Sequence, residues 1–538
     1  MRRPVHGAAA FRWLAGAPAV LLAGVAQTLS FSPFEWWWLQ LVSLGVLAHA
    51  TAHATPRRAG WLGWLFAVGW LVSGFWWLYI SMHDFGGMNP ALAAAAVVVL
   101  AALLGAYYAA AMALWARLRT GRPGRDLLLW ASCWVLAELA RGLVFTGFPW
   151  IASGYAHAAG PLAAWAPWIG VYGLCTLAAA VAGAGALWLG EAPLRVRAQV
   201  SAIVALVVLA AHLLPDQFTQ STGTLRVSLL QPNVAQDIKF DPQRLEAQLH
   251  GLVRQLSEAR GSLVVTPESV LPVSRAQLSE GYWDALRSTL QPAPTSASAP
   301  AVGASTRAAL IGIFVGDDAS GYVNSVVALS PLATPGSAAL PGATSAGEYR
   351  YGKRHLLPFG EIIPPGFRWF VDLMNIPLAD QARGHTTDAF AFGGQRLRPL
   401  VCYEDLFGED IVSSVVGAQA ATVFVNVSNL AWFGRLLVQD QHLQFSQMRA
   451  IEFQRPFVRS TNTGATAVVD HRGQVTARLP PGTEGILETT VEGRIGQTPY
   501  ARWLAACGLW PLVGLALAVV VAAAGAGSRA RPRSAPRP

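Results

Sequence analysis

Long apolar runs, separated by short polar segments, fill the first 214 residues of the chain. A helix needs about 20 mostly apolar residues to cross the hydrocarbon core of a bilayer, so each run of that length predicts a transmembrane helix. We expect seven such helices before residue 215 and an eighth near the C-terminal end. They cover residues 11–29, 35–54, 60–80, 90–114, 127–145, 162–190, 196–214 and 503–524. The first run resembles a secretory signal peptide, but six more spans follow it, and we expect it to be retained.

Residues 215–500 show another pattern, in which short β-branched runs alternate with helical stretches. The predicted strands are 225–230, 262–266, 309–316, 399–403 and 422–428, and the predicted helices are 242–258 and 441–453. Alternating strands and helices are typical of an α/β domain. Two segments rich in Ala, Pro, Ser and Gly, 291–306 and 331–347, indicate surface insertions.

Three parts are therefore expected along the chain. The first is a seven-helix transmembrane domain (1–214), and the second is the α/β domain (215–500). The third, residues 501–538, holds the last transmembrane helix and a basic tail, which we expect to be disordered after Gly525.

Composition and charge place the chain in a membrane. Hydrophobic residues make up 53% and charged residues 13%, whereas about a quarter of the residues of a soluble globular protein are charged. The net charge of +9 comes from arginines in short segments beside apolar runs, not from a stripe across a folded domain, so nucleic acid is not an expected partner. These basic segments alternate with loops that hold almost no Lys or Arg. The positive-inside rule then predicts that both termini are cytoplasmic and that residues 215–500 lie on the other face, which in a bacterium is the periplasmic face of the inner membrane.

One of the four cysteines stands apart from the others. Cys133, Cys175 and Cys507 lie in apolar stretches, where we expect them to pack as small hydrophobic residues. No CxxC, HExxH or Cys/His cluster occurs, so neither a disulfide nor a metal site is predicted. Cys402, in VCYEDLFG, follows a predicted strand, where a side chain can enter a cleft while the next backbone N–H groups stabilise an oxyanion. It is a candidate nucleophile, and the alternative is a buried strand cysteine.

Two further residues could assist Cys402. Glu268 follows another apolar strand in TPES, and as a general base it would accept the thiol proton. Lys353, in YGKRHLLPFGEIIP, would stabilise a thiolate and later the negative charge of a tetrahedral intermediate. Taken singly, each is more simply a solvated loop residue.

Together these segments resemble the nitrilase superfamily, whose Glu, Lys and Cys triad occurs in the same order. The separations along the chain, 353 − 268 = 85 and 402 − 353 = 49 residues, are compatible with it. Because the triad lies among membrane spans, the resemblance narrows to the apolipoprotein N-acyltransferase family. The strings that carry it are LVFTGFPW (143–150), GVYG (170–173), LLQPNVAQDIKFDP (229–242), HLLPFGE (355–361), CYEDLFGE (402–409), NVSNLAWFG (426–434), QHLQFSQMRAIEFQRPFVRSTNTGAT (441–466) and QTPYAR (497–502).

The resemblance implies a nitrilase-like αββα sandwich as the catalytic domain and a two-step reaction. Cys402 would take a fatty acyl group from a phospholipid as a thioester, with Glu268 as base and Lys353 stabilising the intermediates. The acceptor would be the α-amino group of the N-terminal diacylglyceryl-cysteine of an apolipoprotein. No cofactor or metal is implied, and the protein's other partners would be membrane lipids.

The resemblance also implies supporting roles for Glu361, Tyr403 and Glu404. A loop-anchoring role for Glu361 is an equal alternative. Tyr403 and Glu404 could instead shape the turn, and the backbone N–H of Tyr403 is a better oxyanion donor than its side chain.

Three positions depart from the family pattern: Phe240 and Thr266 each replace a usual Trp, and Leu430 replaces a usual Asp. They spare the triad and alter the expected shape of the acyl pocket, where Phe240 and Trp432 are candidate substrate-binding residues. Their effect on specificity is left open by the sequence.

Glu138 and Arg141 form a candidate pair three residues apart on one predicted membrane helix. Ionisable residues within membrane helices often mark functional sites, and this pair could bind a phospholipid headgroup. The simpler interpretation is an ion pair that stabilises the helix.

Two other functions are compatible with these residues. One is a membrane-tethered nitrilase or amidase that hydrolyses a C–N bond, with water in place of the lipid amine. The other is a non-catalytic lipid-binding or scaffold protein, for which Cys402→Ser would leave the function unchanged.

Overall fold

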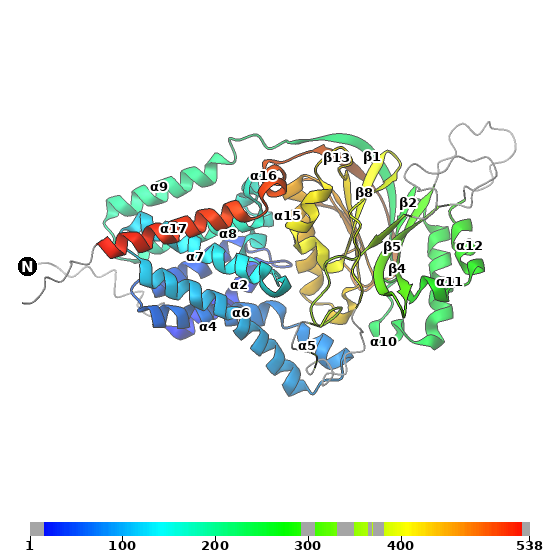
Figure 1. The fold of residues 1–538 in the computed structure, drawn as a ribbon, viewed down its shortest axis with the longest axis horizontal. Coiled ribbons are helices and arrows are strands. Elements are labelled where there is room, and N and C mark those ends of the chain that lie inside the picture. The colour runs from blue at the N-terminus through cyan, green and yellow to red at the C-terminus, as the bar shows by residue number, and fades with distance from the viewer. Residues whose placement is uncertain (1–15, 292–306, 331–348, 364–367, 369–380, 530–538) are drawn as a thin grey trace, which may run out of the picture. The chain divides into compact units, whose positions relative to one another are not determined.

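The computed structural model describes residues 16–291, 307–330, 349–363, 368 and 381–529 (Figure 1). The two predicted insertions, apart from Gln291, and the last residues of the tail lie outside this part. The contacts between residues divide the chain into two compact units. One comprises residues 1–78, 90–216 and 506–538, and the other comprises residues 79–89 and 217–505.

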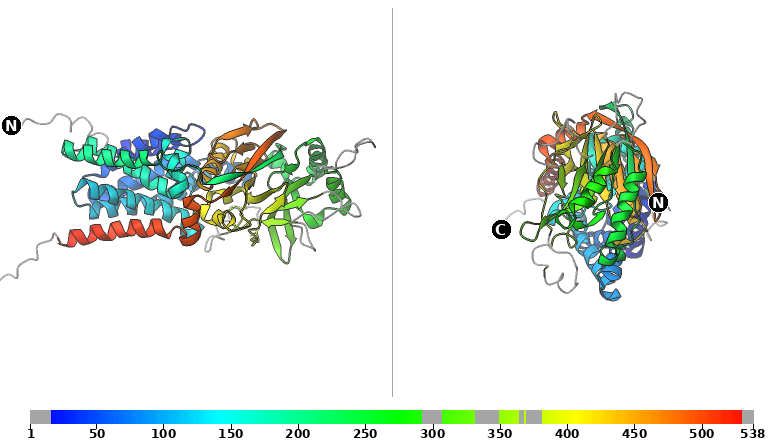
Figure 2. Two further views of the ribbon diagram at one scale, coloured as in Figure 1. Left: turned by 90° about the horizontal axis from the view of Figure 1, so that it is seen from above. Right: turned by 90° about the vertical axis from the view of Figure 1, so that its right-hand side faces the viewer.

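The first unit is helical. Its main helices are α2 (Ala17–Gln27), α3 (Trp37–Thr51), α4 (Pro56–Phe75), α6 (Pro90–Leu118), α7 (Pro123–Leu143), α8 (Ala166–Ala186), α9 (Leu194–Ala210) and α17 (Trp510–Arg529). Proline occupies the first turn of several of them, where its missing N–H and fixed φ favour a helix start. α4 packs on α6, α6 on α7, and α7 on both α8 and α17 (Figures 1 and 2). Gly63 of α4 allows a close approach, since a Cβ there would lie 2.8 Å from the backbone oxygen of Tyr108.

The expected eight membrane spans are not confirmed. Within the described residues, three helical stretches are long and apolar enough to cross a membrane: Pro90–Leu118, Pro123–Thr146 and Pro161–Leu189. Two bent pairs, Pro56–Phe75 with Leu78–Phe85 and Pro499–Cys507 with Trp510–Ala526, raise the number to five if each pair is one span. The other apolar runs form shorter helices. The 15 residues of α3, for example, extend over about 22 Å, less than the roughly 30 Å of a hydrocarbon core.

The second unit contains two β-sheets. In the first sheet the strand order is β13-β1-β2-β4-β5-β6, with β3 paired to β4, and in the second it is β12-β11-β10-β9-β8-β7. The strands of the first are β1 (Thr219–Gln231), β2 (Leu263–Val265), β3 (Leu271–Ser274), β4 (Ala308–Asp317), β5 (Gly321–Leu329), β6 (Arg350–Gly352) and β13 (Gly485–Gly496). Those of the second are β7 (Phe390–Phe392), β8 (Gln395–Val401), β9 (Val423–Ser428), β10 (Phe457–Thr461), β11 (Ala467–Val469) and β12 (Val475–Arg478).

Helices cover the outer faces of the two sheets, which gives four layers. α11 (Pro242–Glu258) and α12 (Glu280–Ser288) lie beside the first sheet, and α15 (Val438–Phe453) packs on β10 and β11 of the second (Figure 1). α11 is capped by the Asp241 side chain, which accepts a hydrogen bond from Gln243 N at 2.9 Å, and it buries Leu252 and Leu256. A core of aliphatic residues from both sheets, including Val265 and Val425, fills the space between them. The unit is the expected αββα sandwich.

The predicted strands and helices of this unit are all present, with one informative difference. The strand expected at 399–403 ends at Val401, and Cys402 begins a 3-10 turn, η9 (Cys402–Leu406), with φ of +52°.

Two expectations elsewhere in the chain were wrong. Cys507 is exposed, unlike the buried Cys133 and Cys175. The last helix continues to Arg529, past Gly525, where the tail was expected to be disordered.

Candidate active site

Cys402 lies where β8 ends and the chain turns sharply. β8 runs parallel to β9, with Val401 opposite Val427. The left-handed backbone of Cys402 is unusual for a residue with a side chain and must be held by its surroundings. Two side chains hold it: Asn426 Nδ2 and His442 Nε2 lie 3.0 and 3.1 Å from the Cys402 carbonyl oxygen. The thiol of Cys402 is half-buried at this turn.

Glu268 follows β2, the central strand between β1 and β4. Its side chain is almost buried, and each carboxylate oxygen accepts one hydrogen bond. Asn324 Nδ2 donates to Oε1 at 2.7 Å, and the backbone N–H of Asn429 donates to Oε2 at 2.8 Å. Since Asn324 belongs to the first sheet and Asn429 follows a strand of the second, the carboxylate is fixed between the two sheets.

Lys353 follows β6 and is 1% exposed. Its Nζ lies 2.6 Å from Glu361 Oε1 and 3.6 Å from Glu268 Oε1. Burial alone would lower the pKa of this ammonium, but the carboxylates of Glu361 and Glu268 outweigh burial and raise it. Lys353 therefore stays protonated at physiological pH and cannot act as the base.

The thiol of Cys402 lies within the electrostatic reach of the same groups. Burial, and next the charge of Glu268, raise its pKa well above the ordinary value, while the Lys353 ammonium opposes this. The resting sulfur is thus a thiol, and it requires a base before it can attack. The three predicted triad residues are brought together at the ends of β2, β6 and β8.

Glu361 anchors the lysine loop. In addition to Lys353, it accepts a hydrogen bond at Oε2 from the backbone N–H of Leu357 at 2.8 Å. Burial raises the pKa of its carboxyl, and the Lys353 ammonium counters that effect. The loop-anchoring alternative and a role beside the reacting sulfur are both compatible with this position.

Glu404 and Tyr403 hold the turn after the nucleophile. The Glu404 carboxylate accepts from the Tyr351 hydroxyl at 2.7 Å and from the backbone N–H groups of Arg354 and Val401, both also at 2.7 Å. The Tyr403 ring is buried against His355 and Phe407. Glu404 therefore ties the lysine loop to the end of β8.

The rings of Phe240 and Trp432 lie together. Their ring centroids are 6.3 Å apart, and Trp432 also contacts Phe85 at 5.7 Å. Phe85 belongs to the segment 79–89, which groups with this unit. The residue before Phe240, Lys239, donates to the backbone oxygen of Glu268 at 3.2 Å, and its Nζ is 5.8 Å from the Phe240 ring centroid, so Lys239 links this aromatic group to the base.

Comparison with known proteins identifies the family. A family model described as the apolipoprotein N-acyltransferase N-terminal domain matches residues 23–184, and one described as carbon-nitrogen hydrolase matches residues 226–500. The apolipoprotein N-acyltransferase of Verminephrobacter eiseniae is 46% identical over 525 residues, covering 91% of this chain and 93% of that protein. The chain belongs to the apolipoprotein N-acyltransferase family. The family member of Ralstonia nicotianae is 42% identical over 495 residues, covering 90% of this chain and 89% of its own length.

Solved structures also resemble the catalytic part of this acyltransferase family member. A CN-hydrolase superfamily protein from Xanthomonas campestris is 17% identical, with a TM-score of 0.35, and the match covers 53% of this chain and 96% of that one. Together with the carbon-nitrogen hydrolase match, the described sandwich gives the second unit its fold class.

Two of the three residues that depart from the family pattern, Thr266 and Leu430, are buried and help to hold the fold. Thr266 is buried, and its Oγ1 accepts a hydrogen bond from Gly312 N at 3.0 Å, which ties β2 to β4. Leu430 is buried at the start of η11 (Leu430–Phe433), the turn that carries Trp432.

Glu138 and Arg141, in the helical unit of this family member, form a fully buried ion pair at 2.9 Å. Arg141 also donates to the Tyr108 hydroxyl at 2.9 Å and to the backbone oxygens of Phe148 and Trp150, while Glu138 accepts from Ser153 N. These contacts tie α7 to the chain that follows it, which favours the structural interpretation over headgroup binding.

Several residues that hold this acyltransferase site were not predicted. Asn324, Asn426 and His442 position Glu268 and Cys402, and beneath the turn Asp405 forms a buried ion pair at 2.8 Å with Arg459. Asn426 and His442 lie within sequence strings that carry the family resemblance, so they could have been found from the sequence. Asn324 lies in β5, and no motif around it indicates a functional role. Within the described part of the chain, no group of three or more His, Cys, Asp or Glu side chains could hold a metal ion.

Proposed function

We propose that Cys402 carries a fatty acyl group from a phospholipid to the α-amino group of an N-terminal diacylglyceryl-cysteine. The family membership makes the chain an acyltransferase of lipoprotein maturation. The observation that supports this assignment of roles is the convergence of Glu268 and Lys353 on the turn of Cys402, with each carboxylate oxygen of Glu268 held by a separate donor. Such preorganisation keeps the base in one orientation.

In the first step Glu268 removes the thiol proton as the sulfur attacks the ester carbonyl carbon of the phospholipid. The carbonyl oxygen becomes an oxyanion, which the Lys353 ammonium and backbone N–H groups of the turn stabilise. The C–O bond of the ester then breaks, and the proton held by Glu268 passes to the departing lysophospholipid oxygen. The product is a thioester on Cys402.

In the second step the amine of the lipoprotein attacks the thioester carbon. Glu268 accepts a proton from the attacking nitrogen, the C–S bond breaks, and that proton returns to the sulfur. The amide and the free thiol remain. A thioester suits transfer to an amine if water is excluded, and the aromatic rings of Phe240 and Trp432 supply apolar surface beside the site.

The membrane placement belongs to the same proposal. We propose that the helical unit lies in the bacterial inner membrane, with both termini cytoplasmic and residues 215–500 periplasmic. The distribution of arginines among the loops supports it, as do the apolar helices α6, α7 and α8. Some of the expected eight spans would then be shorter helices, accommodated by a locally thinned bilayer or by neighbouring helices.

The test is intact-mass analysis of the full chain after incubation with phospholipid that carries a labelled acyl chain. We expect one labelled acyl group on the wild-type protein and none on Cys402→Ser. The Cys507→Ser variant is the matched control, because Cys507 is an exposed thiol outside the site, and it should be labelled like the wild type. Labelling of Cys402→Ser, or of neither protein, would contradict the proposal.

The amidase alternative is not favoured, since the N-terminal family match and the relatives are those of N-acyltransferases. Release of ammonia from a small amide, without transfer of label from phospholipid, would support it instead.

A further inference from the structure

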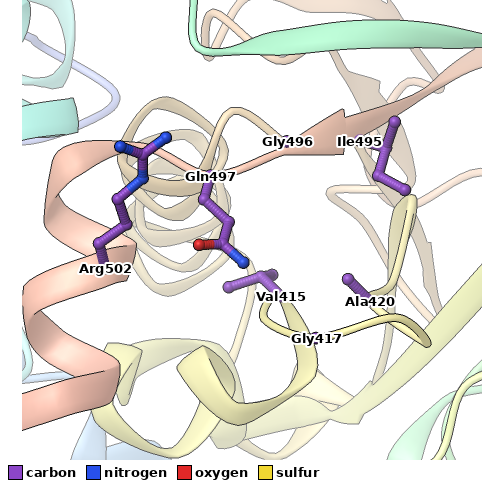
Figure 3. A pocket seen from close by; sticks show the side chains of 7 residues that line it. All are labelled: Val415, Gly417, Ala420, Ile495, Gly496, Gln497 and Arg502. Atoms are coloured by element: carbon purple, nitrogen blue, oxygen red, sulfur yellow. The ribbon is translucent and has the colours of Figure 1, made fainter.

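The catalytic unit has a cavity whose lining includes none of the triad residues. It has a volume of about 250 Å³ and is lined by Val415, Gly417, Ala420, Ile495, Gly496, Gln497 and Arg502. One wall is the loop before β9, and the other is the connection from β13 into α16 (Pro499–Cys507). Figure 3 shows Gln497 extending toward Val415, with Arg502 projecting from the helix beside it. None of these residues takes part in the acyl-transfer steps.

Three further arginines lie near the cavity. Arg396 donates to the Ala420 backbone oxygen at 2.6 Å, and Arg455 donates to the Gly496 backbone oxygen, also at 2.6 Å. These two bonds hold the cavity's walls through backbone oxygens, so neither guanidinium is neutralised by them. Arg494, next to Ile495, has Glu492 at 3.7 Å as an acidic partner.

Arg455 is affected both by its burial and by the charges of the other two arginines. Burial, and then the charges of Arg494 and Arg396, lower its pKa to about 10. Arg502 is exposed at the cavity, and within the described residues its side chain makes no hydrogen bond or ion pair. An anion in the cavity would relieve the repulsion and give Arg502 a partner.

The chain around the cavity leads directly to a membrane helix. Arg502 lies eight residues before Trp510, the first residue of the apolar helix α17. Trp503 and Trp510 flank that connection, and tryptophan is enriched at the level of lipid headgroups. A phosphate carried by a lipid is therefore favoured over one free in solution.

We propose that this cavity binds the phosphate of a phospholipid headgroup, with Arg502 as its principal ligand. The site is separate from the position where Cys402 attacks an acyl ester. A lipid held there would keep the β13–α16 connection at the bilayer surface. Its volume of about 250 Å³ admits a phosphate group but not the two acyl chains, which would remain outside the cavity.

The test is native mass spectrometry of the detergent-solubilised full chain titrated with phosphatidylglycerol, with diacylglycerol as the lipid that lacks phosphate. We expect a first phosphatidylglycerol molecule to bind with higher affinity than any further phosphatidylglycerol molecules. Diacylglycerol should show no such high-affinity binding. Arg502→Gln should raise the dissociation constant about tenfold, the loss of one charge-assisted contact. Gln497→Glu, which places a negative charge in the cavity, should weaken binding at least as much.

Arg244→Gln is the matched control, since Arg244 is an exposed arginine on α11. It should bind phosphatidylglycerol like the wild type, and the thermal unfolding of each variant shows whether its fold is intact. Equal affinity of wild type and Arg502→Gln, or equal weakening in Arg244→Gln, would overturn the proposal. The proposal would also be overturned if inorganic phosphate saturated the cavity and phosphatidylglycerol did not displace it, because the cavity would then bind a free anion. Labelling of Cys402 by labelled phospholipid at saturating concentration should be unchanged in Arg502→Gln, so the two proposals fail independently.

Discussion

The ion pair between Lys353 and Glu361 offers a sharp test of how the site is charged. In Glu361→Gln the side chain keeps its size but loses its charge, and Lys353 keeps Glu268 as its acidic neighbour at 3.6 Å. Burial, which lowers the pKa of Lys353, is then opposed by one carboxylate instead of two. The pKa of the ammonium should fall, and its positive charge should be lost as the pH rises.

The magnitude follows from the burial of the pair. Both side chains are almost inaccessible to solvent, 2% and 9% exposed, and their nitrogen and oxygen are 2.6 Å apart. Breaking a buried pair by removal of one partner costs about 3–5 kcal/mol. If that cost falls on the charged transition state, thioester formation slows by roughly 10²- to 10⁴-fold.

The assay is the rate of thioester formation on Cys402 as a function of pH. In the wild type the pKa of Lys353 is raised, so the lysine should stay protonated and no activity should be lost through its deprotonation over the pH range of the assay. Glu361→Gln should lose activity at high pH, whereas the control Glu246→Gln, an exposed residue of α11, should not. A Glu361→Gln profile parallel to the wild type would refute the electrostatic argument and leave Glu361 as a loop anchor only.

Two further predictions concern stability. Burial raises the pKa of Glu409 to about 7, so the folded state favours its protonated form, and the folded protein loses stability as the pH rises from about 4.5 to 7. Glu409→Gln should remove up to about 3 kcal/mol of that pH dependence, measured as unfolding temperature against pH, and an unchanged slope would contradict it. Asp405→Asn would leave the Arg459 guanidinium buried without its carboxylate and should cost about 3–5 kcal/mol in the free energy of unfolding. A chemical denaturation midpoint equal to that of the wild type would show that His442 and Ser446 suffice to hold the arginine.

The sequence predicts best what depends on local pattern. The strands that end near Glu268 and Cys402 have apolar residues on both faces, and their ends could be located within two residues. Lys353 was found through the order of the three motifs. Asn324 could not be predicted, because its function arises only when β5 is paired next to β4, far from Glu268 along the chain. The number of spans could not be predicted either, because hydropathy does not show where a helix begins and ends within an apolar run. In the run 35–54, for example, helix α3 extends only from Trp37 to Thr51.

The segment 79–89 has a practical consequence for anyone who wishes to produce the sandwich alone. Ile80 packs closely on Gly434, since a Cβ added to Gly434 would lie 2.6 Å from Ile80 Cδ1. Phe85 packs on Trp432. A truncation that begins at Gln217 would remove Ile80 and Phe85 and expose the apolar surface that they cover around Trp432. A soluble fragment should therefore carry this stretch grafted back through a linker, or replace Trp432 with a polar residue, to avoid aggregation.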